Sequence, residues 1–180
     1  LERSSPAVFA AVAMTAAFSA YACMYAFRKP FTVGRFAGVT VLGLDYKTML
    51  VAAQVVGYMI SKFVGIRLVS AVRPERRALG ILVLVGLAWL ALAGLAVAPP
   101  WLGVACLLAN GLPLGMVWGL VFGFLEGRRS SEVLAAGLSA SFIVSSGLVK
   151  TVGHVVLHGW GVPEAQMPAV VGALFALPLL

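Results

Sequence analysis

The hydrophobic residues of this chain fall into six long runs, which are separated by short stretches rich in charge, glycine or proline. The runs cover about residues 7–31, 48–72, 78–98, 102–125, 133–157 and 167–180. All but the last reach the roughly 20 residues that an α-helix needs to cross a hydrocarbon core. Because lipid offers no hydrogen-bond partner to a bare backbone, such runs are expected to be helices rather than strands. The pattern predicts an all-α membrane protein with six transmembrane helices.

The basic residues between the runs predict the orientation. With a cytoplasmic N-terminus, the inner side holds Arg3, Arg67, Arg73, Arg76, Arg77, Arg128 and Arg129, and the second and third outer loops hold no Lys or Arg. Lys and Arg collect in cytoplasmic loops, so this orientation is favoured. The first outer loop carries Arg28, Lys29, Arg35 and Lys47. This loop violates the rule unless Arg28 belongs to the first helix.

Composition excludes most other classes of protein. Hydrophobic residues make up 62% of the 180 residues and charged residues 11%, and the mean hydropathy is +1.04. Globular chains are about 45–50% apolar and about 25% charged, so a soluble domain is excluded. The net charge of +7 is interpreted as a signal of topology, and the expected partners are a lipid bilayer and no nucleic acid. The sequence lacks an initiator methionine and stops inside an apolar run, which predicts that it is a piece of a longer protein.

Three basic residues lie inside the expected spans, where charge is costly and marks a functional candidate. They are Arg28, Lys62 and Lys150, and each belongs to a polar stripe at helical spacing. The stripes are Tyr21, Tyr25, Arg28 and Thr32; Gln54, Tyr58 and Lys62; and Ser146, Lys150, His154 and His158. Snorkelling to the membrane surface is the alternative explanation, most of all for Arg28. No carboxylate lies at comparable depth, so we expect the three cations to face one cavity that takes an anion.

Other patterns narrow the possible chemistry. Glycine recurs at every fourth position from Gly111 to Gly127, which predicts close helix packing along one face. His154 and His158 have the spacing of half a metal site, but no other ligand obviously completes it, so no metal is expected. No P-loop, G-x-S-x-G or H-E-x-x-H motif occurs. We therefore expect neither an enzyme nor a cofactor.

Two runs resemble a known family. YACMYAFRKPF (residues 21–31) and GYMISKF (residues 57–63) are similar to helices 1 and 2 of the organophosphate:phosphate antiporters. These glycerol-3-phosphate and hexose-phosphate carriers belong to the major facilitator superfamily. The resemblance implies the N-terminal half of such a transporter, with spans 1–3 and 4–6 as inverted repeats, and a C-terminal six-helix bundle of the same protein that is missing here. It also implies that Arg28 and Lys62 bind the substrate phosphate and that span 1 continues past Pro30. The segment NGLPLGMVWGLVFGFLEGRR is similar to an uncharacterised bacterial membrane family of the same superfamily.

The chain departs from the antiporter pattern at two positions. Ser70 stands about where the superfamily carries an aspartate in the loop between helices 2 and 3. We expect Glu126 to take over that role in a cytoplasmic gate, through an ion pair with Arg67, Arg73 or Arg76. The antiporters' histidine in helix 5 is also absent, and Lys150 lies a turn deeper.

The leading hypothesis is a secondary transporter of a small anionic solute, a phosphate ester or inorganic phosphate, in a bacterial cytoplasmic membrane. Arg28, Lys62 and Lys150 would bind the anion, and Tyr21, Tyr25 and Tyr58 would donate hydrogen bonds to it. Two alternatives stay open. One is a non-transporting membrane sensor on the same fold, and the other is a proton-coupled carrier of a cationic or neutral solute.

Overall fold

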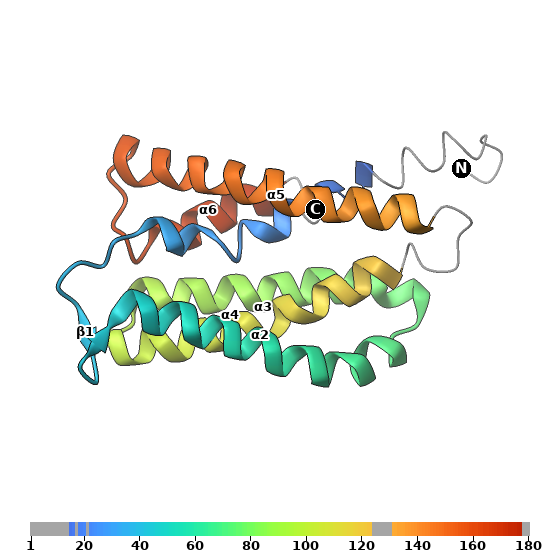
Figure 1. Ribbon diagram of the computed structural model, residues 1–180, viewed down its shortest axis with the longest axis horizontal. Coiled ribbons are helices and arrows are strands. Elements are labelled where there is room, and N and C mark those ends of the chain that lie inside the picture. The colour runs from blue at the N-terminus through green and yellow to red at the C-terminus, as the bar shows by residue number, and fades with distance from the viewer. Residues whose placement is uncertain (1–14, 17, 21, 124–130, 178–180) are drawn as a thin grey trace.

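The computed structural model describes residues 15–177 except residues 17, 21 and 124–130, and this part of the chain is mostly helical. The long helices run side by side in two layers (Figure 1). One layer contains α2 (Tyr46–Ala71), α3 (Arg77–Val97) and α4 (Pro100–Gly123). The other contains α5 (Ser131–His154), α6 (Met167–Ala176) and the N-terminal segment with the 3-10 helix η1 (Pro30–Val33). Short connectors complete the chain: strands β1 (Thr40–Val41) and β2 (Leu44–Asp45), the 3-10 helix η2 (Pro74–Arg76) and the π-helix η3 (Val155–Gly159).

Four helices of the described chain are long and apolar enough to cross a membrane. These segments are Tyr46–Gly65, Arg77–Val97, Pro100–Val121 and Phe142–Gly159, and α6 is a shorter apolar helix. Helices α2 to α5 begin one or two residues before the spans that the hydrophobic pattern predicts. The protein is therefore a multi-pass membrane protein in contact with a lipid bilayer.

The predicted orientation is open to a direct test at the basic turn between α2 and α3. With both free cysteines replaced by serine, we expect a cysteine at position 76 to resist a membrane-impermeant maleimide in intact cells and to react after permeabilisation. A cysteine at position 99, in the turn between α3 and α4, should show the opposite behaviour. Efficient labelling of position 76 in intact cells would reverse the orientation.

Close helix packing organises each layer. Helix α4 packs against both α2 and α3, η1 packs against α5 and α6, and α3 contacts α6 between the layers. A Cβ atom added at Gly111 of α4 would collide with the backbone of α2 at Gln54, and one added at Gly57 of α2 would collide with the backbone of α4 at Leu108. The predicted role of the glycine repeat in close packing is thus confirmed at Gly111, and also at Gly115, which adjoins Ser61.

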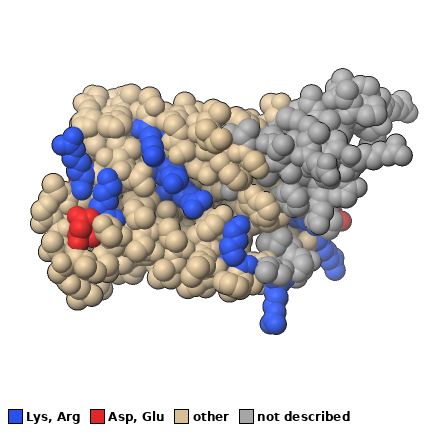
Figure 2. All heavy atoms as spheres, viewed as in Figure 1, with Lys and Arg blue, Asp and Glu red and all other residues tan. Residues whose placement is uncertain are grey.

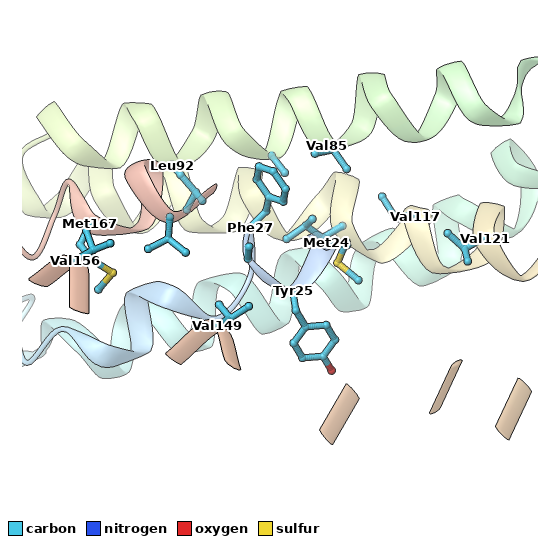
Figure 3. Close-up of a cluster of buried hydrophobic side chains, with 14 residues drawn as sticks. Met24, Tyr25, Phe27, Val85, Leu92, Val117, Val121, Val149, Val156 and Met167 are labelled. Atoms are coloured by element: carbon cyan, nitrogen blue, oxygen red, sulfur yellow. The ribbon is translucent and has the colours of Figure 1, made fainter. Parts of the chain in front are cut away.

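A buried apolar cluster joins the two layers (Figure 3). Phe27, which has no exposed surface, lies between Val85 and Leu92 of α3 on one side and Val149 of α5 on the other. Burial of this apolar surface in both layers holds the N-terminal segment in place, and so sets the position of the residues that follow Phe27.

The loop between the N-terminal segment and α2 is ordered by local and distant contacts. Its hairpin turns at Leu42 and Gly43, which both have positive φ, as the common two-residue hairpin turn requires. Asp45 then caps α2, and hydrogen bonds from the backbone and side chain of Thr48 lower the pKa of its carboxyl. The carboxylate of Glu164, before α6, accepts hydrogen bonds from the backbone N–H groups of Arg35 and Phe36 at 2.9 and 2.6 Å.

Candidate functional site

The candidate site is centred on an interruption of the first helix. The described residues from Thr15 to Tyr25 are helical, residues 26–28 form turns, Lys29 forms a bend, and the 3-10 helix η1 begins at Pro30. A proline in a continuous helix has no N–H for the carbonyl of Ala26, and its ring clashes with that carbonyl. The hydrophobic run at residues 7–31 predicted one helix through residue 31, and this prediction is wrong. The structure instead places Arg28 and Lys29 in the break itself.

Two buried carboxamides satisfy the backbone groups that the break leaves open. Asn110 of α4 donates to the carbonyl of Phe27 at 3.1 Å and to that of Ala88 in α3 at 2.9 Å. Gln54 of α2 donates to the carbonyl of Arg28 at 3.1 Å and to the side-chain oxygen of Asn110 at 2.7 Å. An unpaired buried carbonyl is costly, so the two bonds to Phe27 and Arg28 favour this particular break. The other two bonds tie the carboxamides to each other and to α3. We call Asn110 and Gln54 the carboxamide pair.

Arg28 and Lys62 converge on the same aromatic ring. The Cζ atom of Arg28 lies 4.3 Å from the ring centroid of Tyr58, and the Nζ atom of Lys62 lies 4.9 Å from it. Lys62 also lies 4.7 Å from the ring centroid of Trp118 in α4. Both distances to Tyr58 are within the range of cation–π attraction, which stabilises a cation without neutralising its charge. The arrangement holds two partly buried positive charges against one aromatic ring.

Three further residues, Tyr25, Lys29 and Lys150, lie around this pair. Tyr25 is buried, stacks on Phe142 of α5 at 6.0 Å between ring centroids, and lies close enough to Arg28 to interact with its charge. Lys29 is close enough to both Arg28 and Lys150 to be repelled by their positive charges. Lys150 itself is exposed on α5. The break, α2 and α5 thus bring four basic side chains to the junction of the two layers.

The surface shows the same distribution of charge. Figure 2 shows Lys and Arg side chains spread across one face, some of them near its middle, whereas the acidic side chains visible in this view lie toward its ends. Within the described residues, neither Arg28, Lys62 nor Lys150 forms an ion pair with a carboxylate. Glu164 and Asp45 are occupied by the bonds described above. A site of this kind attracts anions.

Some of the predicted residues cannot be placed in this site. Tyr21 and Glu126 lie outside the described residues, so the expected gate stays a prediction. Its three basic candidates, Arg67, Arg73 and Arg76, are all exposed near the end of α2. His154 and His158 stack on each other at 5.4 Å between ring centroids, and the described residues hold no group of three possible metal ligands.

Asn110, Trp118 and Lys29 were not predicted as site residues from the sequence. Asn110 was the residue most open to prediction, because a carboxamide within an apolar run needs a partner in lipid. Its partners could not be read from the sequence, since the break that they belong to depends on packing. Trp118 resembles a membrane-surface anchor in sequence, and only the packing of α4 on α2 brings it to Lys62.

Comparison with known proteins places the chain in a family but gives it no activity. Residues 30–180 match a family of unknown function, DUF5690, and because the match covers most of the chain, the protein belongs to that family. No curated protein matches the sequence. No solved structure matches it either. The family match identifies neither a major facilitator fold nor a transporter.

Proposed function

We propose that this member of the DUF5690 family is a secondary transporter that moves a small anionic, phosphorylated solute by alternating access. The observation that carries the proposal is the convergence of Arg28 and Lys62 on Tyr58, without a carboxylate partner among the described residues. Like charges in a site of low dielectric repel each other, so such a pair is best stabilised by an anion. Glycerol and hexose phosphates, and inorganic phosphate, are ligands of the right charge.

The packing of the helices supports the transporter architecture within this proposal. An inverted repeat of three helices relates the first helix to α4, α2 to α5, and α3 to α6. Under this relation, the packing of α4 on α2 and α3 corresponds to the packing of the first segment, through η1, on α5 and α6. The contact between α3 and α6 corresponds to itself, because the repeat relates these two helices to each other. Such repeats are typical of secondary transporters, whose substrate sites lie near the middle of the membrane at interrupted helices.

Each residue has a defined role in the proposed site. The planar guanidinium of Arg28 forms two parallel hydrogen bonds to phosphate oxygens, and Lys62 and Lys150 add positive charge. Tyr25 and Tyr58 donate hydrogen bonds from their hydroxyl groups. In the same proposal, a second six-helix bundle outside residues 1–180 closes over the bound anion, and Glu126 with Arg67, Arg73 or Arg76 forms the cytoplasmic gate.

Thermal unfolding of the purified protein tests whether the site binds phosphate esters. We expect glycerol 3-phosphate or a hexose 6-phosphate, at about 100 times its dissociation constant, to raise the unfolding midpoint by about 5–10 °C. Arg28→Lys keeps the charge but loses the paired hydrogen bonds, so it should weaken binding about tenfold or more with little loss of intrinsic stability. Arg35→Lys, in the exposed outer loop, is the matched control and should bind as the native protein does. An equal response to the uncharged glycerol or hexose would refute the anion site.

Transport distinguishes a carrier from the sensor alternative. Proteoliposomes loaded with unlabelled phosphate ester should accumulate the labelled ester by exchange, and Arg28→Lys should slow this uptake. Binding with no exchange in either direction would favour the sensor. Uptake that depends on a proton gradient but not on the phosphate group would favour the proton-coupled carrier of a cationic or neutral solute.

A further inference from the structure

A second site lies at the turn between α2 and α3. It is a pocket of about 640 Å³, a volume in the range of small-molecule sites. Leu68 and Val72, at the end of α2, form one wall, and Leu79 and Val83 of α3 form the other. Met116 and Leu120 of α4 also line it. We call this pocket the arginine-rimmed groove, because Arg73 and Arg76 complete its lining.

The groove exists because of how the three helices pack. Helices α2 and α3 both pack on α4, and the pocket is lined by residues of all three helices. Gly80 of α3 adds room, since a Cβ atom at this position would lie 3.2 Å from Leu120 and would push the side chains apart. The hollow is therefore part of the helix packing and does not depend on the turn alone.

The two arginines are held on one side of a short turn. The backbone N–H of Arg76 donates to the carbonyl of Arg73 at 2.9 Å, which closes a 3-10 turn. Residues three apart in such a turn lie one above the other, so both side chains reach the same opening. Both are exposed and, within the described residues, neither has a carboxylate partner. Glu75, which lies between them, is exposed and does not line the groove.

The apolar walls continue onto surface that faces lipid. On α3, Leu79 and Val83 are 62% and 53% exposed, and the same face goes on through Leu87 and Leu90, at 52% and 59%. In a helix that crosses the membrane, this face contacts hydrocarbon. The groove thus opens to the bilayer along its length and carries positive charge at its polar end.

We propose that the arginine-rimmed groove binds an anionic phospholipid. Its phosphate lies between Arg73 and Arg76, and an acyl chain lies along Leu79 and Val83 over Met116. The complementarity of charge at the rim favours an anionic over a zwitterionic headgroup, and basic residues beside a transmembrane helix are a common means of such recognition. The apolar walls favour a lipid over a soluble phosphate ester, which has nothing to place against them.

The test measures lipid-dependent stabilisation of the purified, delipidated protein. We expect phosphatidylglycerol to raise the unfolding midpoint by about 5–10 °C at saturation, and phosphatidylethanolamine to raise it much less. Arg73→Gln with Arg76→Gln should weaken the response to phosphatidylglycerol about 25-fold in lipid concentration, about fivefold per arginine. Arg35→Gln with Lys47→Gln removes two charges from the opposite end of the molecule and should leave the response unchanged.

A second pair of variants tests the apolar walls independently of charge. Val83→Trp fills the groove and should abolish the response to phosphatidylglycerol, whereas Leu87→Trp, one helical turn further along the same exposed face, should keep it. The response to glycerol 3-phosphate should survive Val83→Trp, which separates this site from the proposed transport site. Equal stabilisation by both lipids, or a full response of Val83→Trp to phosphatidylglycerol, would overturn the proposal. A loss of stability in Val83→Trp without lipid, with no response of the native protein to phosphatidylglycerol, would mean that a protein segment fills the groove instead.

Discussion

Replacing Asn110 by leucine is expected to lower the free energy of unfolding by about 2–4 kcal/mol. The substitution keeps the size of the side chain roughly constant but removes both donors, so the carbonyl of Phe27 loses its partner and that of Ala88, inside α3, loses a second bond. A buried carbonyl left unpaired, like that of Phe27, costs about 1–3 kcal/mol. Gln54 also loses the acceptor that its amide group uses at 2.7 Å. The midpoint of thermal unfolding, measured in detergent without ligand, checks the effect.

The control for Asn110→Leu is Thr151→Val, on the exposed face of α5. The Thr151 hydroxyl donates to the carbonyl of Gly147 within the same helix, so its removal leaves no buried group unpaired, and a change within about 0.5 kcal/mol is expected. The double variant Gln54→Leu with Asn110→Leu should cost less than the sum of the two single variants, since the bond between the two side chains is lost only once. Full additivity, or a neutral Asn110→Leu, would show that the carboxamide pair does not hold the break.

Replacing Gly111 by alanine is expected to destabilise the protein by about 2 kcal/mol or more. At an unconstrained helix position the same change is stabilising, because glycine loses more backbone entropy than alanine. The sign reverses here because the new Cβ atom meets backbone atoms of α2 at Gln54 and Tyr58, which cannot rotate away as a side chain would. Helices α2 and α4 must then separate, and both lose the van der Waals contacts that stabilise helix pairs in lipid.

Gly86 of α3 provides the matched control for this second prediction. A Cβ atom there has no neighbour within 4 Å, so Gly86→Ala should be neutral or stabilising by up to about 1 kcal/mol. Lys62 and Tyr58 lie on α2, and Trp118 lies on α4. Separating the two helices moves Lys62 away from Trp118, so Gly111→Ala should also weaken phosphate-ester binding. A stable Gly111→Ala variant with native ligand affinity would contradict the close contact of α2 and α4.

Both variants act on the same part of the site from different sides. The carboxamide pair fixes the backbone at Arg28, and the close approach of α4 to α2 places Trp118 beside Lys62. If the transport proposal is right, either change alters the distance between the two cations. Losses of stability and of anion affinity should then occur together in these variants, in contrast to Arg28→Lys, which changes affinity alone.

The sequence by itself determined where the long helices lie and which charged side chains lie within membrane spans, where charge is energetically unfavourable. A helix needs about 20 apolar residues to cross the bilayer, and this requirement acts on each run separately, so the starts of α2 to α5 follow from local hydropathy. The glycine repeat around Gly111 likewise signals close packing from spacing alone. The same reasoning singled out Arg28 and Lys62 before their surroundings were known, because a charge within a span is unfavourable whatever the fold.

Only the tertiary structure decided what these residues contact. Pro30 indicates that a helix is disturbed, but the form of the break depends on Asn110, which lies 83 residues from Phe27 in the chain. The contacts of Tyr58 with Arg28 and Lys62, and of Trp118 with Lys62, depend on how the helices pack. The arginine-rimmed groove has the same origin, since its walls come from three helices. The local pattern of residues determines whether each segment is stable as a membrane-spanning helix. Contacts between residues distant in the chain are determined by how the helices pack, and the sequence of one segment does not specify that packing.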